Sequence, residues 1–322
     1  MDEDSSLPSV SIIILNHNGI NLLGRCLSSI IKTSYPNFEI VIVDNNSTDG
    51  SPDFIRKNFP SCRIIALDHN EGFSRANNIA AKDVSSKYVL FLNNDTFVTD
   101  GHWLGELVRV IDRDDSIVIA QSLLMRPTGE VDSSGDFATK RGITYNSKIM
   151  DSKNPRLILS ARGASMIVRR EFFLSVGGFD DDYYISFEDV ELGWKANIWG
   201  YKVVMVPTSV VYHLGGTTTR NMSEIITFHG LKNQLSLLTT HFETGRAVTN
   251  LILYFARLLL RFFKLTFKLG KNEEMFVVDK SAVFRAIMWY FRNFGTIRAK
   301  AKHINKLRKK STSELVEIGV IS

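Results

Sequence analysis

The stretch YVLFLNNDTFV, residues 88–98, begins as an apolar run and turns polar at Asn93, Asn94 and Asp95. The run YVLFL is typical of a strand that is buried on both faces of a sheet. The polar residues after it have two explanations. Asn and Asp favour turns, and they also supply the oxygen ligands that hold a metal ion and a phosphorylated ligand at the carboxyl ends of strands.

Outward from this stretch, strand-like and helix-like segments alternate along residues 10–125. Apolar runs predict further strands at 10–15, 38–43, 63–67 and 117–125. Apolar residues near helical spacing predict helices at 20–33, 51–59, 73–84 and 103–111. Strands that alternate with helices imply βαβ units. The sequence therefore predicts an α/β fold with a Rossmann-like, mostly parallel sheet flanked by helices.

The regular pattern stops at residues 126–160, which are polar and weakly patterned. We interpret this segment as an irregular excursion, which could include a hairpin, of the kind that shapes a variable wall of a pocket. Beyond it we expect a strand and a helix within 164–179, a helix at about 187–199 and a strand at 203–207. Two serines are candidate helix caps, Ser51 for the helix at 51–59 and Ser186 for the helix at 187–199.

Four of the predicted strands end in polar clusters, which occupy residues 16–19, 44–51, 68–78 and 93–95. One such cluster alone indicates a turn, but parallel strands bring all four to one edge of the sheet, which favours a shared polar site. There, Asp44 could accept a hydrogen bond from a base or a ribose, and Asp95 could bind Mg²⁺ or Mn²⁺ and through it a diphosphate. No GxxxxGK[ST] or GxGxxG motif follows a strand, which argues against P-loop and Rossmann dehydrogenase phosphate sites.

Several blocks, in order along residues 9–220, carry a family resemblance: DNNSTDGS, NEGFSRANN, VLFLNNDT, VGGFDDDYYISFEDVELGWKANIWGY and VYHLGG. Together they resemble a family 2 glycosyltransferase with the GT-A fold, in the branch of rhamnosyltransferase-like enzymes of surface polysaccharide assembly. The resemblance implies transfer of a sugar from a nucleoside diphosphate sugar, with UDP and dTDP both compatible. The acceptor would be a hydroxyl of a glycan or of a polyprenyl-linked glycan.

The resemblance also implies roles for particular residues. Donor contacts would come from Asn16, Asp44, Asn46, Asn70, Gly72, Asn77 and Asn94. The residues NND occupy the place of the DxD motif of the family, so Asp95 would be the main ligand of a divalent cation and Asn93 a weaker one. His213, in VYHLGG, would be a further ligand, although a lone histidine after a strand is more often structural.

The segment SFEDVELGWK, residues 186–195, has a structural and a chemical interpretation. Acidic side chains in a first helical turn complement the helix dipole, and Ser186 with Asp189 approximates a capping box. The same block matches the Glu-Asp motif of the family, whose carboxylate deprotonates the acceptor. The resemblance therefore implies that Asp189 is the general base of an inverting, single displacement and that Glu188 positions the acceptor.

Charge separates the chain into two parts. Residues 246–310 carry 16 Lys or Arg and 3 Asp or Glu, a net charge of +13 in a chain of net charge +5. Within 247–270, the basic residues Arg257, Arg261, Lys264 and Lys268 form one stripe of a helix. Such a stripe favours a helix lying on a membrane surface over one that spans it. We predict a catalytic domain at 1–245 and a basic amphipathic helical region at 246–322.

The remaining observations concern the cellular location and the partners of the protein. Cys26 and Cys62 have no CxxC partner and the N-terminus has no apolar signal segment, so we expect a cytoplasmic protein on the inner face of the cell membrane. The C-terminal aromatic residues lie within apolar faces, which disfavours nucleic acid as a partner. Two alternatives stay open: packing of the C-terminal helices on the catalytic domain or a second subunit, and a catalytically weak scaffold that binds sugar nucleotides.

Overall fold

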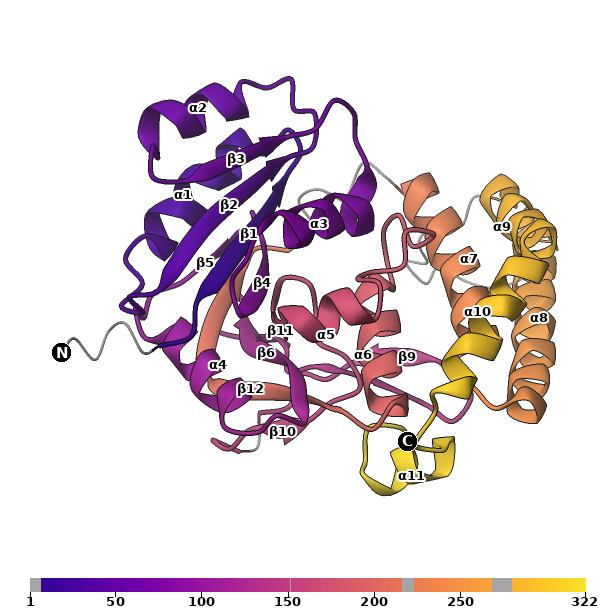
Figure 1. Ribbon diagram of the computed structural model, residues 1–322. Coiled ribbons are helices and arrows are strands. Elements are labelled where there is room, and N and C mark those ends of the chain that lie inside the picture. Colours follow the sequence, from indigo (N-terminus) through magenta and orange to yellow (C-terminus); the bar gives the residue numbers. More distant parts are fainter. Residues whose placement is uncertain (1–6, 151, 216–222, 268–279) are drawn as a thin grey trace.

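A computed structural model of the protein describes residues 7–150, 152–215, 223–267 and 280–322. Its centre is a ten-stranded sheet. Eight strands lie in the order β10-β12-β6-β11-β4-β1-β2-β3, and the other two, β5 and β7, pair with β12 and β6. Helices flank this sheet on both faces, as Figure 1 shows. The predicted α/β fold class is therefore confirmed.

The half of the sheet built first along the chain is parallel. It consists of β1 (Val10–Asn16), β2 (Phe38–Asp44), β3 (Arg63–Ala66) and β4 (Tyr88–Asn93). The other half is mixed, because β11 (Ser165–Arg169) runs antiparallel between β4 and β6 (Ile117–Met125). Strand β12 (Lys202–His213) pairs parallel with β6 and is longer than the predicted 203–207.

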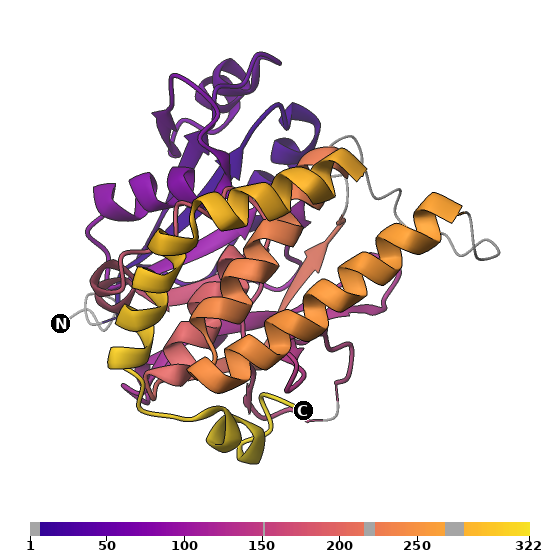
Figure 2. The ribbon, with the colours of Figure 1, turned by 90° about the vertical axis from the view of Figure 1, so that its right-hand side faces the viewer.

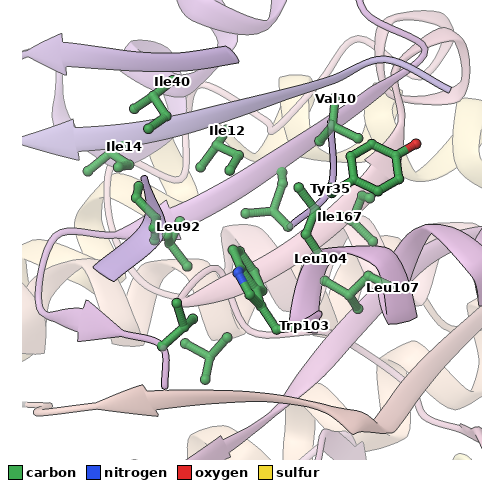
Figure 3. Close-up of a cluster of buried hydrophobic side chains, with 14 of the residues drawn as sticks. Val10, Ile12, Ile14, Tyr35, Ile40, Leu92, Trp103, Leu104, Leu107 and Ile167 are labelled. Atoms are coloured by element: carbon green, nitrogen blue, oxygen red, sulfur yellow. The ribbon is translucent and has the colours of Figure 1, made fainter. Parts of the chain in front are cut away.

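The central strands are apolar on both faces because helices cover both faces. Ile12 and Ile14 of β1 point into a cluster that contains Trp103 and Leu104 of α4 (Trp103–Asp112), as Figure 3 shows. Ile13, between them, belongs to the cluster on the opposite face. Alternate side chains of a strand point to opposite faces, so a continuous apolar run is required when neither face meets water.

The predicted excursion contains short strands, β7 (Val131–Ser133), β8 (Asp136–Ala138), β9 (Thr144–Asn146) and β10 (Arg156–Leu157). Strands β8 and β9 form a two-stranded antiparallel sheet. The excursion therefore contains a hairpin, while β7 and β10 pair with the main sheet. Strand β5 (Thr96–Phe97) continues directly from the polar end of β4 and pairs with the last residues of β12.

The helices of the sheet region are α1 (Ile20–Ile30), α2 (Ser51–Asn58), α3 (Gly72–Asp83), α4, α5 (Arg170–Ser175) and α6 (Glu188–Ile198). Both predicted serine caps are wrong. Gly50 is the N-cap of α2, and the Ser51 hydroxyl donates to Asp49, whose carboxylate also accepts from the Ser51 amide at 3.0 Å. Phe187 is the N-cap of α6, with no side-chain cap, because the backbone enters this helix in a left-handed conformation.

In the described residues after β12, the chain forms α7 (Ser223–Thr240), α8 (Thr244–Phe267), α9 (Lys280–Arg292), α10 (Phe294–Lys306) and α11 (Thr312–Glu317). Helices α7 to α10 lie together on one side of the molecule, as Figures 1 and 2 show from two directions. The last residues return to the sheet region, where Ile321 bridges to Ala138 of β8 and Leu315 packs in the cluster of Trp194.

Helix α8 exposes apolar side chains. Val248, Ile252, Leu253, Leu259 and Leu260 are 39% to 69% exposed, and Arg257 of the predicted basic stripe is also exposed. The stripe residue Lys268 and the side chains of Arg261 and Lys264 lie outside the described residues. Among the helices described, none combines the length and the apolar character that crossing a bilayer requires.

Candidate active site

The strand ends meet at one edge of the sheet, as their spacing predicts. Asn16, at the end of β1, lies opposite Asp44 at the end of β2, and Leu15 lies opposite Asn93 at the end of β4. A parallel register therefore aligns three polar termini side by side.

Amide side chains join these termini. The Asn94 amide donates to Asn16 Oδ1 at 2.9 Å, and the Asn16 amide donates to Ser47 Oγ at 3.1 Å and makes a longer contact of 3.4 Å with Asp44 Oδ1. Asn16 and Asp44 are almost fully buried, at 0% and 3% exposed. Buried polar groups need such partners, so this network fixes the loops that follow β1, β2 and β4 relative to one another.

A second amide network holds the loop after β3. Asn45 donates to Asn70 Oδ1 at 2.8 Å, and the Gly72 amide donates to the same oxygen at 2.9 Å. The Tyr184 hydroxyl adds a third hydrogen bond to Asn70 Oδ1, at 3.2 Å. Gly72 has φ of 74°, and a side chain there would collide with Tyr184, so glycine is required by both conformation and space.

A cleft of about 530 Å³ opens beside these networks. Its lining includes eight of the predicted site residues: Asn70, Gly72, Asn93, Asn94, Asp95, Glu188, Asp189 and His213. Asn16 and Asp44 are not in the lining but connect to it through Asn94. Asn46 is exposed, with φ of 63°, and Asn77 is buried in α3, where it donates to the Phe73 carbonyl at 2.9 Å.

Asp95 and His213 lie together on the cleft wall because β5 pairs with the end of β12, with His213 opposite Thr96. The distance from His213 Nε2 to Asp95 Oδ1 is 3.3 Å, and His213 Nδ1 lies 2.7 Å from Asp132 Oδ2. Arg126 holds the other Asp132 oxygen at 2.6 Å. A carboxylate behind one ring nitrogen orients the other nitrogen toward its ligand.

This donor set fits a divalent cation. Among the described residues no group of three or more His, Cys, Asp or Glu side chains is arranged to hold a metal ion by itself. Mg²⁺ is typically bound by one or two carboxylates together with substrate phosphates. Asp95 supplies one carboxylate here, and His213 adds an imidazole nitrogen 3.3 Å from it. Burial lowers the pKa of His213, but its hydrogen bonds to Asp132 and Asp95 outweigh burial and raise it to about 9. A cation at Nε2 would therefore replace a proton.

Glu188 and Asp189 begin α6 and line the same cleft. Asp189 Oδ2 accepts from the Gly163 amide at 3.2 Å, and its Oδ1 accepts from the Val190 amide at 2.8 Å. Glu188 is 7% exposed, and its Oε2 has no hydrogen-bond partner among the described residues. Burial and the neighbouring Asp189 charge raise the pKa of Glu188. Burial also raises the pKa of Asp189, against the opposing charge of Arg162.

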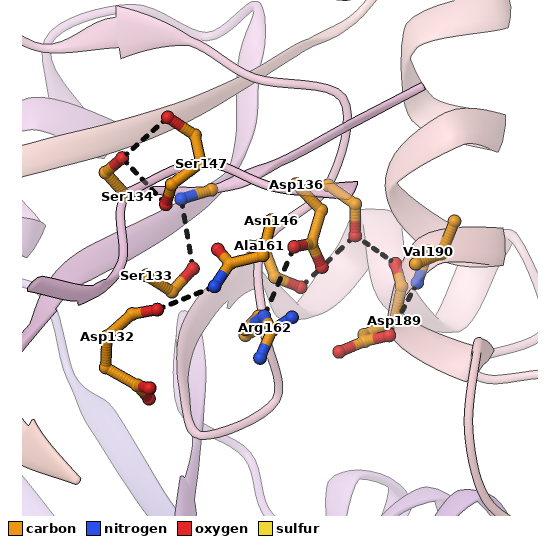
Figure 4. Close-up of polar contacts among 12 residues, drawn as sticks. Asp132, Ser133, Ser134, Asp136, Asn146, Ser147, Ala161, Arg162, Asp189 and Val190 are labelled. Carbon is orange, nitrogen blue, oxygen red and sulfur yellow. Dashed lines mark hydrogen bonds and ion pairs between the residues drawn. The ribbon is translucent and has the colours of Figure 1, made fainter. Parts of the chain in front are cut away.

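Two residues that the sequence did not single out, Arg162 and Asp136, complete this wall. Arg162 Nε lies 3.2 Å from Asp136 Oδ1, and Figure 4 shows the Arg162 side chain between Asp132 and Asp189. Burial raises the pKa of Asp136 to about 6, and the Arg162 charge limits that rise. The positive charge of Arg162 therefore offsets the negative charges of three carboxylates, Asp132, Asp136 and Asp189. The sequence signal of Arg162 is a charged residue three positions before the buried strand β11.

The comparison with known protein families agrees with these features. A sequence model of glycosyltransferase family 2 matches residues 11–177, which is more than half of the chain and contains the ends of β1, β2, β3 and β4. The chain belongs to glycosyltransferase family 2. The resemblance of the sequence blocks to this family is therefore confirmed.

Two curated relatives of this glycosyltransferase are informative. The O-antigen biosynthesis protein RfbC of Myxococcus xanthus is 34% identical over 221 residues, which are 64% of this chain and 17% of that protein. The N-acetylglucosaminyl-diphospho-decaprenol L-rhamnosyltransferase of Mycobacterium tuberculosis is 26% identical over 257 residues, which are 70% of this chain and 82% of that enzyme. The chain thus spans a small part of the first relative and most of the second.

Solved structures agree on the fold. GalNAc-T7, solved with UDP, GalNAc and Mn²⁺, is similar with a TM-score of 0.57 and 18% identity over 77% of this chain and 55% of that one. Residues 1–349 of TarS from S. aureus, in complex with UDP, are similar with a TM-score of 0.53 and 18% identity, over 92% and 91%. At this identity the likeness shows the GT-A fold of this family 2 glycosyltransferase and no more.

Proposed function

We propose that the protein transfers a sugar from a nucleoside diphosphate sugar to a hydroxyl of a glycan or a lipid-linked glycan, with inversion at the anomeric carbon. One observation carries the proposal. A single cleft is lined both by Asp95 and His213, which suit a cation on a diphosphate, and by Glu188 and Asp189, which suit proton transfer. The name of the M. tuberculosis relative, an enzyme acting on a decaprenol-linked sugar, supports a lipid-linked acceptor.

The residues divide the work of one displacement. Asp189 takes the proton of the acceptor hydroxyl. As it does so, the acceptor oxygen bonds to the anomeric carbon, and the bond from that carbon to the diphosphate breaks. Glu188, which lines the cleft next to Asp189, positions the acceptor. Asn70, Gly72, Asn93 and Asn94 line the donor side, with Asn16, Asp44, Asn46 and Asn77 behind or beside it. A Mg²⁺ or Mn²⁺ held by Asp95 and His213 would stabilise charge on the leaving diphosphate.

A donor screen tests this function. The purified protein is incubated with UDP-, dTDP- and GDP-sugars, with Mg²⁺, Mn²⁺ or EDTA, and release of the nucleoside diphosphate is measured. We expect release from one donor class, dependent on the cation and accelerated by a polyprenyl diphosphate-linked acceptor. Tight nucleotide binding without release from any donor would favour a sugar-nucleotide-binding scaffold instead, for which Asn93 in place of a carboxylate is the supporting feature.

Replacing Arg162 with Met is expected to move the acid limb of the pH profile to higher pH. Protonated Asp189 cannot act as a base, and burial already raises its pKa against the Arg162 charge. Without that charge the pKa of Asp189 rises further, so activity is lost at a higher pH as the solution is acidified. The measurement is kcat/KM against pH, which reports groups of the free enzyme.

Arg156→Met is the matched control for this shift. Arg156 comes from the same region, and its guanidinium donates to Ser134 Oγ at 2.7 Å and Ser147 Oγ at 2.9 Å. We expect its acid limb to coincide with that of the unmodified protein. An unmoved limb in Arg162→Met would show that Arg162 does not set the protonation of the base.

We further propose that the protein lies on the cytoplasmic surface of the cell membrane through α8 and α9. The surface consists of Val248, Ile252, Leu253, Leu259 and Leu260 of α8, together with Phe284 and Phe291 of α9, which are 65% and 60% exposed. Phe255 of α8 stacks on Phe291 with ring centroids 6.1 Å apart, which joins the two helices. Exposed apolar surface within a segment of net charge +13 suits anionic lipid.

The double substitution Ile252→Glu and Leu259→Glu is expected to weaken vesicle binding by about tenfold or more, because each removes apolar burial and adds a repelled charge. Sedimentation with phosphatidylcholine vesicles containing phosphatidylglycerol measures the effect. Ile149→Glu is the control, since Ile149 is 63% exposed but belongs to the loop after β9. Equal binding by the double variant and the control would refute attachment through α8.

A further inference from the structure

The backbone just before the two cleft carboxylates is strained. Ser186 has φ of 71° and Phe187 has φ of 70°, so two consecutive non-glycine residues are left-handed. This conformation brings Cβ close to the following carbonyl and is unfavourable for every residue with a side chain, most of all a bulky one. Strain of this kind persists only where neighbouring groups hold it.

Asn233 of α7 is the group that holds it. Its side-chain amide donates to the Ser186 carbonyl at 2.6 Å and to the Ile185 carbonyl at 3.1 Å. Its Oδ1 accepts from Lys232 Nζ at 2.7 Å, and the residue is 1% exposed. Both amide hydrogens of a buried side chain are thus used on two successive carbonyls of the strained turn, from 47 and 48 residues away along the chain.

The C-terminal helices α7 and α10 also contact the rest of the loop before α6, which we define as residues 180–187. Lys300 of α10 contacts Asp180 and Asp182, at 2.6 Å in each case, and Lys232 donates to the Asp182 carbonyl. Helix α7 also contacts α9 at a point away from the loop, where Thr239 Oγ1 lies 2.8 Å from the Tyr290 hydroxyl. Figures 1 and 2 show α7 on the side of the molecule where α8, α9 and α10 gather.

The donor side of this loop has separate supports. The Phe73 amide of α3 donates to the Tyr184 carbonyl at 2.8 Å, and the Ser74 hydroxyl donates to the Tyr183 carbonyl. The Tyr184 hydroxyl in turn reaches Asn70. These contacts precede the strained pair, so loss of Asn233 leaves them in place.

We propose that Asn233 is a positioning residue for the glycosyl transfer step: by holding Ser186 and Phe187 in the left-handed conformation, it fixes the start of α6 and aims Asp189 at the acceptor. The inference rests on the proposed role of Asp189 as general base. It assigns to the C-terminal helices a part in catalysis through the loop, separate from any part at the membrane.

The test begins with Asn233→Ala. We expect kcat to fall by about 10²-fold, as displacement of a catalytic group by about 1 Å can cause, with the donor KM changed less than about threefold because the donor-side contacts remain. Hydrogen exchange of the amides in residues 185–189 is expected to accelerate. Thr239→Ala, which removes a hydrogen bond of the same helix to Tyr290, is the matched control and should leave kcat and this exchange unaltered.

A second substitution separates positioning from general stability. Glycine adopts the left-handed conformation without steric cost, so Ser186→Gly added to Asn233→Ala should recover roughly tenfold in kcat, compared with the Ser186→Gly single variant as baseline. No recovery, or an equal loss of kcat in Thr239→Ala, would overturn the proposal.

Failure of the proposed function would be seen in a different measurement, the activity of Asp189→Asn. If Asp189→Asn retains sugar transfer, the base assignment is wrong. The exchange of residues 185–189 in Asn233→Ala still reports whether Asn233 holds the turn, because it is read without turnover.

Discussion

Asp189→Asn is expected to lower kcat for sugar transfer by about 10²–10⁴-fold, the usual contribution of a general base, while binding of the nucleoside diphosphate stays within about twofold. The amide keeps the shape of the side chain, and its oxygen can still accept from one of the two backbone amides, Gly163 at 3.2 Å or Val190 at 2.8 Å, that donate to the carboxylate. It cannot accept a proton from the acceptor hydroxyl. Transfer to the acceptor and binding of the nucleotide are measured separately, by product formation and by calorimetry.

One control and one further substitution help to interpret the result for Asp189→Asn. Asp115→Asn removes a carboxylate whose side chain is 98% exposed, in an ion pair with Arg169, and should leave kcat intact. Glu188→Gln should weaken acceptor binding more than donor binding, since Glu188 faces the acceptor side in the proposed mechanism. If Asp189→Asn transfers sugar at the normal rate, a different group must receive the proton and the proposed mechanism fails.

The shared polar edge could be predicted from the sequence because it follows from one geometric rule. Parallel strands end at the same edge, so residues that terminate β1, β2 and β4 had to be neighbours wherever the sheet was parallel. The registers of Asn16 with Asp44 and of Leu15 with Asn93 show that neighbourhood directly. The position of His213 required more, because the sequence indicated a strand only to residue 207.

What could not be predicted depends on contacts between distant segments. Arg162 acquires its importance from Asp136 and Asp189, and no periodicity links these three positions. Ser186 looked like a cap because its side chain is of the right type, but Asn233 imposes a left-handed backbone that no local preference favours. Local rules failed where a tertiary contact maintains strain, which is where functional residues are concentrated.

Asp95→Ala is expected to abolish the dependence of donor binding on a divalent cation and to weaken cation affinity by about 10²-fold or more. Asp95 is 6% exposed on the cleft wall and supplies the only carboxylate of the NND segment. Loss of an outer-shell partner alone typically costs about 10–100-fold in metal affinity, and loss of a direct ligand should cost at least as much. Mn²⁺ binding in the presence of the nucleoside diphosphate, followed by electron paramagnetic resonance, measures the change.

Asn93→Asp provides the opposite perturbation on the same segment. It supplies a second carboxylate beside Asp95 on the cleft wall, and cation affinity rises with the number of charged ligands, so Mn²⁺ should bind about tenfold more tightly. Opposite shifts in the two variants would place the cation at this strand end, because a site elsewhere would respond to neither. Unchanged Mn²⁺ binding in Asp95→Ala would remove the cation from the NND segment, and His213 would then be a structural histidine held by Asp132 at 2.7 Å.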